Sequence, residues 1–292
     1  MNRYRELEAI YKGNLFHMVG DGFRVMNLIP GDHDLARRLN PFILLDYNSP
    51  FYFPPTDRPF GVGAHPHRGF ETVTIAYQGA VAHHDSAGNH GVIETGDVQW
   101  MTAGAGLLHK EYHAPHFAKQ GGVLQMVQLW VNLPQKNKSA TPGYQALTRK
   151  QMGQYFLPNQ QGSMTIIAGN YANVSGPAKT FSPVNVFDMR LIAQGDAVLE
   201  LPAEHNVAIL VLEGDIIINE QTRAQENQLL VFANNPGVIK LHSNEKPAIL
   251  LVLTAEPLME SMVHYGPFVM NTQEELQQAY KDYHQGKFGF LD

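Results

Sequence analysis

Residues 63–79 read GAHPHRGFETVTIAYQG, and this stretch determines how the rest of the chain is interpreted. Side chains two residues apart on an extended strand point to the same side, so His65 and His67 share one face. A second pair with the same spacing, His109 and Glu111, follows further along the chain. If the two pairs lie on neighbouring strands, three imidazoles and one carboxylate meet at one point inside a barrel.

Such a set of side chains suits a transition-metal ion. Imidazole and carboxylate ligands bind Fe, Mn, Co, Ni, Cu or Zn. Because the set includes a hard carboxylate oxygen, it favours Fe(II) or Mn(II) over Zn. A single pair of histidines on a strand is more often structural, but two pairs of equal parity favour a metal site. The remaining histidines of this region are predicted to lie at the surface or at a pocket rim: His83, His84, His90, His113 and His116.

Short apolar runs dominate the chain. They are four to nine residues long and rich in Val, Ile and Leu, with 26 Gly and 18 Pro spread between them. Runs of this length are typical of strands and too short for core helices. We therefore predict an all-β fold of the barrel or jelly-roll type, with strands at residues 42–45, 72–77, 123–131, 207–212, 215–218, 228–232 and 248–253.

Three segments are predicted to be helical. Residues 34–39 can form about one turn, and residues 143–151 give a weaker signal. The clearest helix lies near residues 273–284, where Thr272 can cap the first turn and Glu275 stands three residues later. Its apolar and aromatic side chains recur at helical spacing, which predicts packing onto the outside of a sheet.

The chain also contains a faint internal repeat. In each half a strand leads to a glycine, Gly79 or Gly214, then to a second strand, a polar loop and a further strand. Two packed barrels of similar plan explain this pattern better than one sandwich. We predict an N-terminal, metal-binding barrel at residues 1–138 and a C-terminal barrel, which includes the helix, at residues 139–292.

The C-terminal half lacks a comparable set of ligands. When the halves are aligned on their glycines, Glu200 and Pro202 replace the first histidine pair. Lys240 and His242 replace the second pair. Proline cannot bind a metal, and a lysine ammonium would repel a cation. His205 is predicted to be a polar residue at a strand end, so this barrel is expected to hold no metal.

Composition excludes several classes of protein. The 292 residues include no cysteine, which excludes a disulfide scaffold, a cysteine-bound metal site and a thiol nucleophile. The net charge of −6 argues against a basic face for nucleic acid. No stretch approaches about 18 uninterrupted apolar residues, and the first residues lack the apolar run of a signal peptide. We expect a cytoplasmic protein with neither a membrane nor direct nucleic acid as its partner.

Several segments together resemble the pirin family of the cupin superfamily. HPHRGFETV at 65–73, AGAGLLHKE at 103–111 and YGPFVMNTQEELQQAYKDYHQGKFG at 265–289 carry the resemblance, which extends over nearly the whole chain. It implies two packed cupin barrels, with one divalent metal ion in the N-terminal barrel and no ligands in the C-terminal one. The implied metal ligands are His65, His67, His109 and Glu111.

The resemblance also bears on which glutamate binds the metal. The general cupin pattern takes its carboxylate from the first motif, where Glu71 stands, whereas pirins resemble one another in using the later glutamate, Glu111. Glu71 would face inward as well if the strand ran unbroken, but Gly69 is typical of a bulge. We expect Glu111 to bind the metal, and Glu71 to contact one of the metal ligands without touching the metal itself. The reverse assignment is the alternative.

The resemblance implies quercetin 2,3-dioxygenase activity, in which dioxygen opens the central ring of a flavonol and carbon monoxide is released. Fe(II) is the expected ion, and Glu111 would accept the proton of the substrate hydroxyl. Trp100, Met101 and the aromatic residues 51–53 are expected to form pocket walls. One alternative is an iron-dependent regulator that docks on a transcription factor or a metabolic enzyme. Another is a non-redox metalloenzyme, such as an isomerase of a sugar-like substrate.

Overall fold

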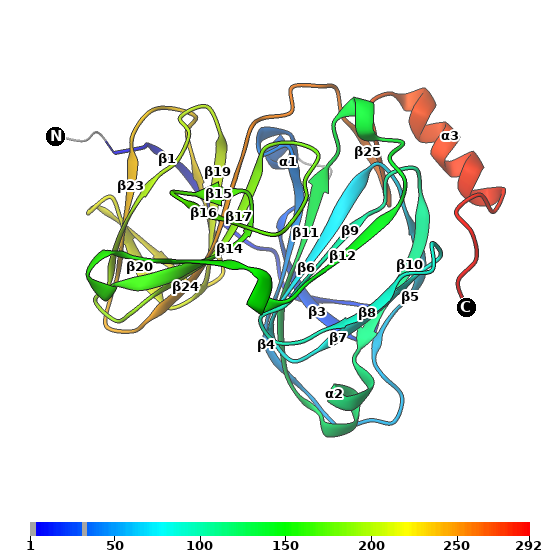
Figure 1. Cartoon of the computed structure of the whole chain (residues 1–292), viewed down its shortest axis with the longest axis horizontal. Helices are drawn as coiled ribbons and strands as arrows, with labels where there is room; N and C mark the ends of the chain where they lie inside the picture. The colour runs from blue at the N-terminus through cyan, green and yellow to red at the C-terminus, as the bar shows by residue number, and fades with distance from the viewer. Residues whose placement is uncertain (1–3, 31–33) are drawn as a thin grey trace. The chain divides into compact units, whose positions relative to one another are not determined.

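The computed structural model describes residues 4–30 and 34–292, which form two compact units (Figure 1). The N-terminal barrel comprises residues 14–149 together with 258–292. The C-terminal barrel comprises residues 150–257 together with those up to residue 13. These bounds differ from the predicted 1–138 and 139–292 because both ends of the chain cross over to the other unit.

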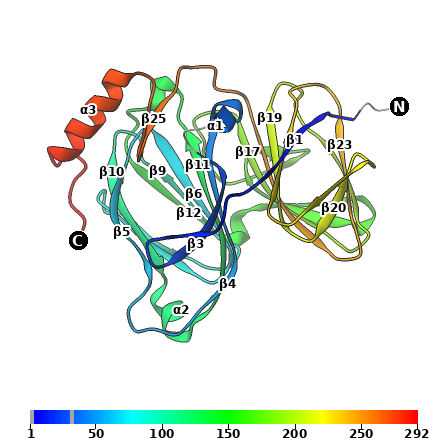
Figure 2. The same cartoon turned by 180° about the vertical axis from the view of Figure 1, so that it is seen from behind.

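Backbone pairing explains the exchange of the two ends. β1 (Leu7–Lys12) pairs antiparallel with β22 (Gln228–Phe232), so it forms an edge of a C-terminal sheet (Figure 2). At the other end, α3 (Gln273–His284) contacts β25 (Val263–Tyr265) and β26 (Phe268–Met270). These elements share an apolar cluster with Leu108 of the N-terminal barrel.

Two antiparallel sheets form the N-terminal barrel. The larger has the strand order β12-β9-β6-β11-β4-β3-β2, and the smaller has the order β5-β10-β7-β8. Facing sheets of this kind enclose their inward side chains between them. The strands are β2 (His17–Val19), β3 (Phe23–Ile29), β4 (Phe42–Phe53), β5 (Gly61–His67), β6 (Phe70–Gln78), β7 (Val81–Asp85), β8 (His90–Ile93), β9 (Val98–Thr102), β10 (Leu107–His113), β11 (Gly122–Asn132) and β12 (Gly143–Leu147).

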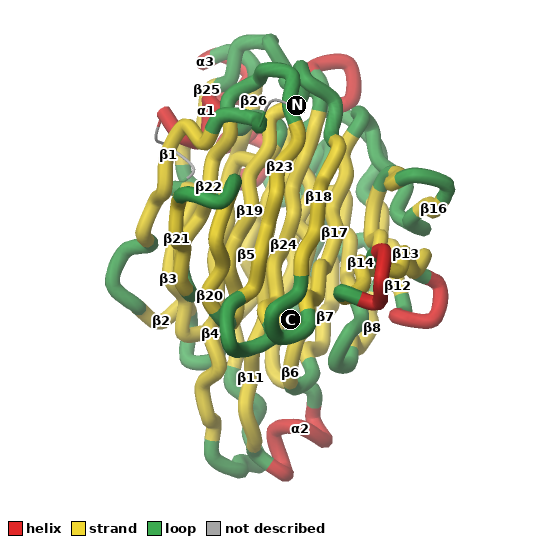
Figure 3. The backbone as a smooth tube through the Cα atoms, turned by 90° about the vertical axis from the view of Figure 1, so that its left-hand side faces the viewer, coloured by secondary structure: helices red, strands yellow, loops and turns green. Residues whose placement is uncertain are grey.

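The C-terminal barrel repeats this plan. Its larger sheet has the order β1-β22-β19-β24-β17-β14-β13, and its smaller sheet has the order β18-β23-β20-β21. The prediction of two all-β cupin barrels is confirmed, and strands dominate the chain in Figure 3. The remaining strands are β13 (Gly153–Phe156), β14 (Gly162–Ala168), β15 (Asn170–Tyr171), β16 (Val174–Ser175), β17 (Val184–Leu191), β18 (Asp196–Glu200), β19 (Asn206–Glu213), β20 (Asp215–Ile218), β21 (Thr222–Gln225), β23 (Val238–Ser243) and β24 (Ala248–Ala255).

The interior of the C-terminal barrel is apolar. On β23, Ile239 and Leu241 are fully buried and belong to a large apolar cluster. Lys240 and His242 alternate with them and face outward, where they lie beside Glu220 and Asp196 respectively. The sequence alignment of this strand was therefore wrong, because it placed outward-facing residues at inward positions. Among the described residues the C-terminal barrel holds no group of potential metal ligands, because apolar side chains fill it.

The helices are short and few. α3 begins at the predicted capping box, in which Thr272 and Glu275 each accept a hydrogen bond from the other's backbone. α1 (Asp34–Arg38) confirms the predicted single turn, and α2 (Pro115–Gln120) was not predicted. The helix predicted at residues 143–151 is wrong, because β12 and a 3-10 turn (Arg149–Gln151) occupy this segment. The other 3-10 turns are Gln135–Asn137 and Pro158–Gln160. No helix of the described chain is long and apolar enough to span a membrane.

Candidate metal centre

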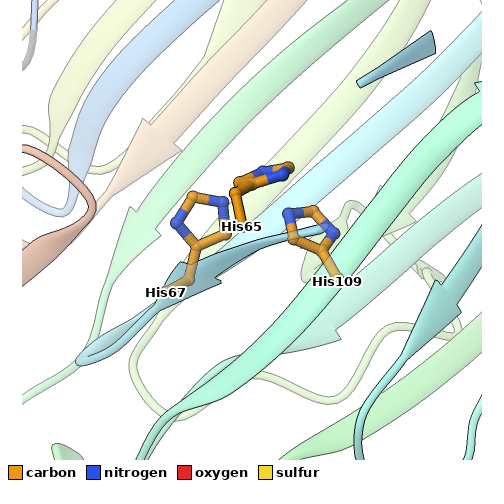
Figure 4. A group of neighbouring side chains, drawn as sticks. All are labelled: His65, His67 and His109. Atoms are coloured by element: carbon orange, nitrogen blue, oxygen red, sulfur yellow. The ribbon is translucent and has the colours of Figure 1, made fainter. Parts of the chain in front are cut away.

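Three histidines meet inside the N-terminal barrel. His65 and His67 lie two residues apart on β5, and the antiparallel register places His109 of β10 directly opposite His65. One ring nitrogen of each histidine lies within 4.8 Å of the others. Figure 4 shows the three imidazoles turned toward one another from the two strands. The predicted convergence of the three imidazoles thus follows from strand pairing.

The surroundings of these imidazoles leave nitrogens available for a metal ion. His109 is fully buried, yet neither of its ring nitrogens has a hydrogen-bond partner, and Nδ1 of His67 has none either. Burial, followed by the neighbouring histidines, lowers the pKa of both His67 and His109 well below the usual value. Neutral imidazole is the form that binds metals, and buried polar atoms without partners are rare in proteins. The site therefore fits a metal ion.

His65 has a defined orientation as well. Its Nδ1 lies 2.8 Å from the carbonyl oxygen of Gly63, which can only accept a hydrogen bond. The proton is thereby assigned to Nδ1, and Nε2 keeps its lone pair. A backbone carbonyl that fixes the tautomer of a ligating histidine is a common supporting contact in metal sites.

Glu111 reaches the same centre from β10. One carboxylate oxygen lies within 4.8 Å of a ring nitrogen of His109 and of a fourth histidine, His83. The ligand atoms of Glu111, His65 and His67 do not all lie within this distance of one another. Oε1 of Glu111 accepts a hydrogen bond from the Gln99 amide at 3.4 Å. It also lies 3.1 Å from the Thr74 hydroxyl, whose single proton goes to the nearer Oε1 of Gln128 at 2.6 Å. These contacts occupy Oε1, so Oε2 is the oxygen available to a metal or to a substrate proton.

His83 was missed by the sequence reasoning, which placed it at the surface or at a rim. It is fully buried on β7, directly opposite Glu111 in the register. The Gln99 amide donates to Nδ1 at 3.1 Å, so Nε2 carries the proton and faces Asp85 at 3.3 Å. A hydrogen-bonded chain therefore runs from Asp85 through His83 and Gln99 to Glu111. The signal in the sequence was the two-residue spacing that puts His83 on the same face of β7 as Val81 and Asp85.

The other histidines differ in their placement. His84, His90 and His116 lie partly or fully exposed, as predicted. His113 is buried, because its ring packs against Phe53 and its Nε2 lies 2.8 Å from the carbonyl oxygen of Gly22. It therefore has a structural role rather than a place at the surface.

Glu71 does not contact any of the metal ligands, which corrects the prediction. Gly69 adopts φ = +90°, and a Cβ there would lie 1.9 Å from the carbonyl oxygen of Val269. This conformation ends the strand of His67 and shifts the side-chain parity by one residue. Thr74, whose hydroxyl contacts Glu111, therefore faces the centre, and Glu71 occupies the opposite face of β6.

The side chain of Glu71 is buried. It is 1% exposed, and its Oε1 accepts a hydrogen bond of 2.7 Å from the Thr102 hydroxyl. Burial raises the pKa of Glu71 to about 7, because the charged form loses its hydration and gains little in return. The group is thus separated from the histidine cluster in position and in chemistry.

A cavity of about 240 Å³ opens onto the centre, and His65, His67 and Glu111 form part of its wall. The predicted wall residues are not among its lining. Phe51 and Tyr52 are exposed, whereas Trp100 and Met101 are buried elsewhere in the barrel. The other lining residues come mainly from the larger sheet: Val19, Phe23, Val25, Leu44, Asp46, Asn48, Val62, Met126, Gln128 and Trp130.

Comparison with known proteins agrees with this arrangement of two barrels. The family described as Pirin matches residues 22–131, and the family described as the Pirin C-terminal cupin domain matches residues 186–289.

Similar proteins cover the whole chain. A Pseudomonas aeruginosa protein with the provisional name quercetin 2,3-dioxygenase is 45% identical over 97% of this chain and 98% of its own length. Human pirin is 33% identical over 93% of this chain and 90% of its own. A crystal structure of quercetin 2,3-dioxygenase from Acinetobacter baumannii is 46% identical, with a TM-score of 0.95 over 99% of this chain and 100% of that one. The chain belongs to the pirin family.

Proposed function

We propose that the protein is a dioxygenase with one divalent metal ion, most suitably Fe(II), bound by His65, His67, His109 and Glu111. The observation that carries this proposal is the fully buried His109, whose two ring nitrogens have no partner. Three imidazoles and one carboxylate form a mixed ligand set that suits Fe(II) or Mn(II), and Co, Ni, Cu and Zn are compatible with it.

We further propose a flavonol such as quercetin, together with dioxygen, as the substrates. The similar proteins from Pseudomonas and Acinetobacter carry the name quercetin 2,3-dioxygenase. The cavity beside the histidines has about 240 Å³ and is bounded by apolar and aromatic side chains such as Phe23, Met126 and Trp130. Such walls suit a small planar molecule and exclude bulk water from it.

The residues of the chain then have distinct roles. When bound, the ion would supply a positive charge that favours the ionised form of a substrate hydroxyl, and a redox centre for dioxygen chemistry. Oε2 of Glu111 takes the proton of that hydroxyl, while the Gln99 amide holds Oε1 in place. The buried imidazoles stay neutral and therefore do not compete for this proton.

Two glutamate variants test the proposal. Glu111→Gln should bind the metal less tightly and lose turnover even when metal is resupplied, because an amide carries no charge and cannot accept the proton. We expect a loss of at least about 10²-fold in kcat. Glu71→Gln is the matched control, since Glu71 occupies the other face of β6. It should retain both metal and turnover.

The assay follows quercetin loss in the visible spectrum, alongside elemental analysis of the purified proteins. A metal-free, inactive Glu71→Gln beside a working Glu111→Gln would reverse the assignment of the two glutamates. Absence of flavonol turnover by the wild-type protein with every divalent ion tested would refute the dioxygenase proposal itself.

A further inference from the structure

Asn48 is an unexplained polar residue in the wall of the cavity. It lies on β4, is 2% exposed, and neither Nδ2 nor Oδ1 of its amide has a hydrogen-bond partner. Its neighbour in the register on β11 is Met126, which offers no hydrogen-bonding group of comparable strength. A buried amide without partners costs free energy in the empty protein, so its presence needs a reason.

Two further polar side chains stand beside Asn48. Asp46 shares its face of β4, and Gln128 lies opposite Asp46 on β11. Oδ1 of Asp46 accepts a hydrogen bond of 2.6 Å from Asn27, and Oε1 of Gln128 accepts one of 2.6 Å from Thr74. The second carboxylate oxygen of Asp46 and the amide nitrogen of Gln128 receive and make no hydrogen bond within the described chain. Both residues line the cavity.

We propose that Asn48, with Asp46 and Gln128, forms a hydrogen-bonding subsite for a hydroxyl group on the part of an aromatic substrate remote from the metal. This inference deepens the proposed function and takes its probes from it. A hydroxyl both donates and accepts, so it matches a subsite that offers amide protons together with amide and carboxylate oxygens. The remaining wall is apolar and suits the aromatic ring itself.

The strand register sets the distance between the subsite and the metal ligands. Thr74, Gln128 and Asp46 face one another on the consecutive strands β6, β11 and β4. Thr74 contacts Glu111, and two strand spacings of roughly 5 Å separate it from Asp46. A substrate bound at Glu111 by one hydroxyl therefore needs to span about 10 Å along the sheet to reach the subsite. Molecules of two or three fused or linked rings have this length.

The first test needs no metal. Asn48→Leu keeps the approximate volume but removes both unpartnered atoms. We therefore expect the melting temperature of the metal-free protein to rise, by about 2–8 °C for a change of this kind. Binding of quercetin, followed through the fluorescence of Trp130 in the cavity wall, should at the same time weaken about 10–100-fold. A lower melting temperature, or unchanged quercetin affinity, would overturn the subsite.

The second test compares two probes. Quercetin carries hydroxyls remote from the 3-hydroxyl, and 3-hydroxyflavone carries none. The wild-type protein should prefer quercetin in affinity and in kcat/KM, and Asn48→Leu should reduce that preference to within about threefold by weakening quercetin alone. Leu44→Val is the matched control, because Leu44 lines the same cavity on the same face of β4 but offers no hydrogen bond. It should affect both probes equally.

The outcomes separate this inference from the proposed function. Equal affinity of the wild-type protein for both probes, or equal effects of Asn48→Leu on both, refutes the subsite even if flavonols are turned over. If no flavonol is turned over, the proposed reaction fails, and the affinities of the metal-free protein still decide the subsite.

Discussion

Glu71→Gln should stabilise the protein at alkaline pH and not at acidic pH. The buried carboxyl of Glu71 titrates with a pKa of about 7 in the folded chain and near the ordinary value of 4.5 in the unfolded chain. Because the folded value is raised, the folded state binds the extra proton between pH 4.5 and 7. The free energy of unfolding therefore falls as pH rises through this window, and the loss is complete above about pH 7.

The magnitude follows from the two pKa values. At about 1.4 kcal/mol for each factor of ten in proton affinity, the rise from 4.5 to about 7 corresponds to about 3 kcal/mol. Glutamine is neutral at every pH, and its carbonyl oxygen can still accept the hydrogen bond from the Thr102 hydroxyl. The variant thus avoids the cost of a buried charge without losing this contact.

The assay is urea unfolding of metal-free wild-type and variant protein at pH 4.5 and at pH 8. The free energies of unfolding should agree closely at the lower pH, and the variant should exceed the wild type by about 3 kcal/mol at the higher pH. Taking the difference between the two proteins cancels every other titrating group. A difference that is the same at both pH values would refute the argument, because it would mean that Glu71 has an ordinary pKa in the folded chain.

Three further variants test other parts of the structure. Lys138→Met should lower the free energy of unfolding by about 2–4 kcal/mol, as measured by urea titration. The buried amino group of Lys138 donates hydrogen bonds to the carbonyl oxygens of Gly69 and Val269, and both oxygens would lose this donor in the variant. Gly69→Ala should lower the free energy of unfolding by at least about 3 kcal/mol in the same measurement, because alanine disfavours the positive φ and its Cβ would clash with the carbonyl oxygen of Val269. Unchanged stability would contradict this conformation of residue 69. By elemental analysis, His109→Ala should lose metal whereas His242→Ala should retain it, and equal loss in both would place a ligand in the C-terminal barrel.

The features that follow from alternation along one strand could be predicted from the sequence. His65 and His67 share a face because of their spacing, and His109 and Glu111 do so for the same reason. The short apolar runs and the capping box at Thr272 are equally local signals. Each of these depends only on residues close together in the chain.

Features that depend on a change of parity or on distant neighbours could not be predicted in this way. The positive φ of Gly69 turns Glu71 away from the centre. The glycine did indicate a break in the strand, but the sequence did not show that the break would take Glu71 out of reach of the metal ligands. His83 and Asn48 acquire their significance only from cross-strand neighbours. Such neighbours are set by the pairing of segments that lie tens of residues apart, and the sequence of one chain does not specify that pairing.

A comparison of the two barrels supports the proposal that ligands bind at the unpartnered polar atoms of the N-terminal interior. Both are built from a larger and a smaller antiparallel sheet. The buried face of β10 carries His109 and Glu111, whereas the buried face of β23 carries Ile239 and Leu241. The scaffold therefore closes around a mainly apolar interior, which avoids the cost of buried polar groups without partners. An N-terminal interior that keeps unpartnered atoms on His109 and Asn48 is less stable than the same fold could be. Ligands that satisfy these atoms bind only the folded state, so added Fe(II) and added quercetin should each raise the melting temperature of the wild-type protein.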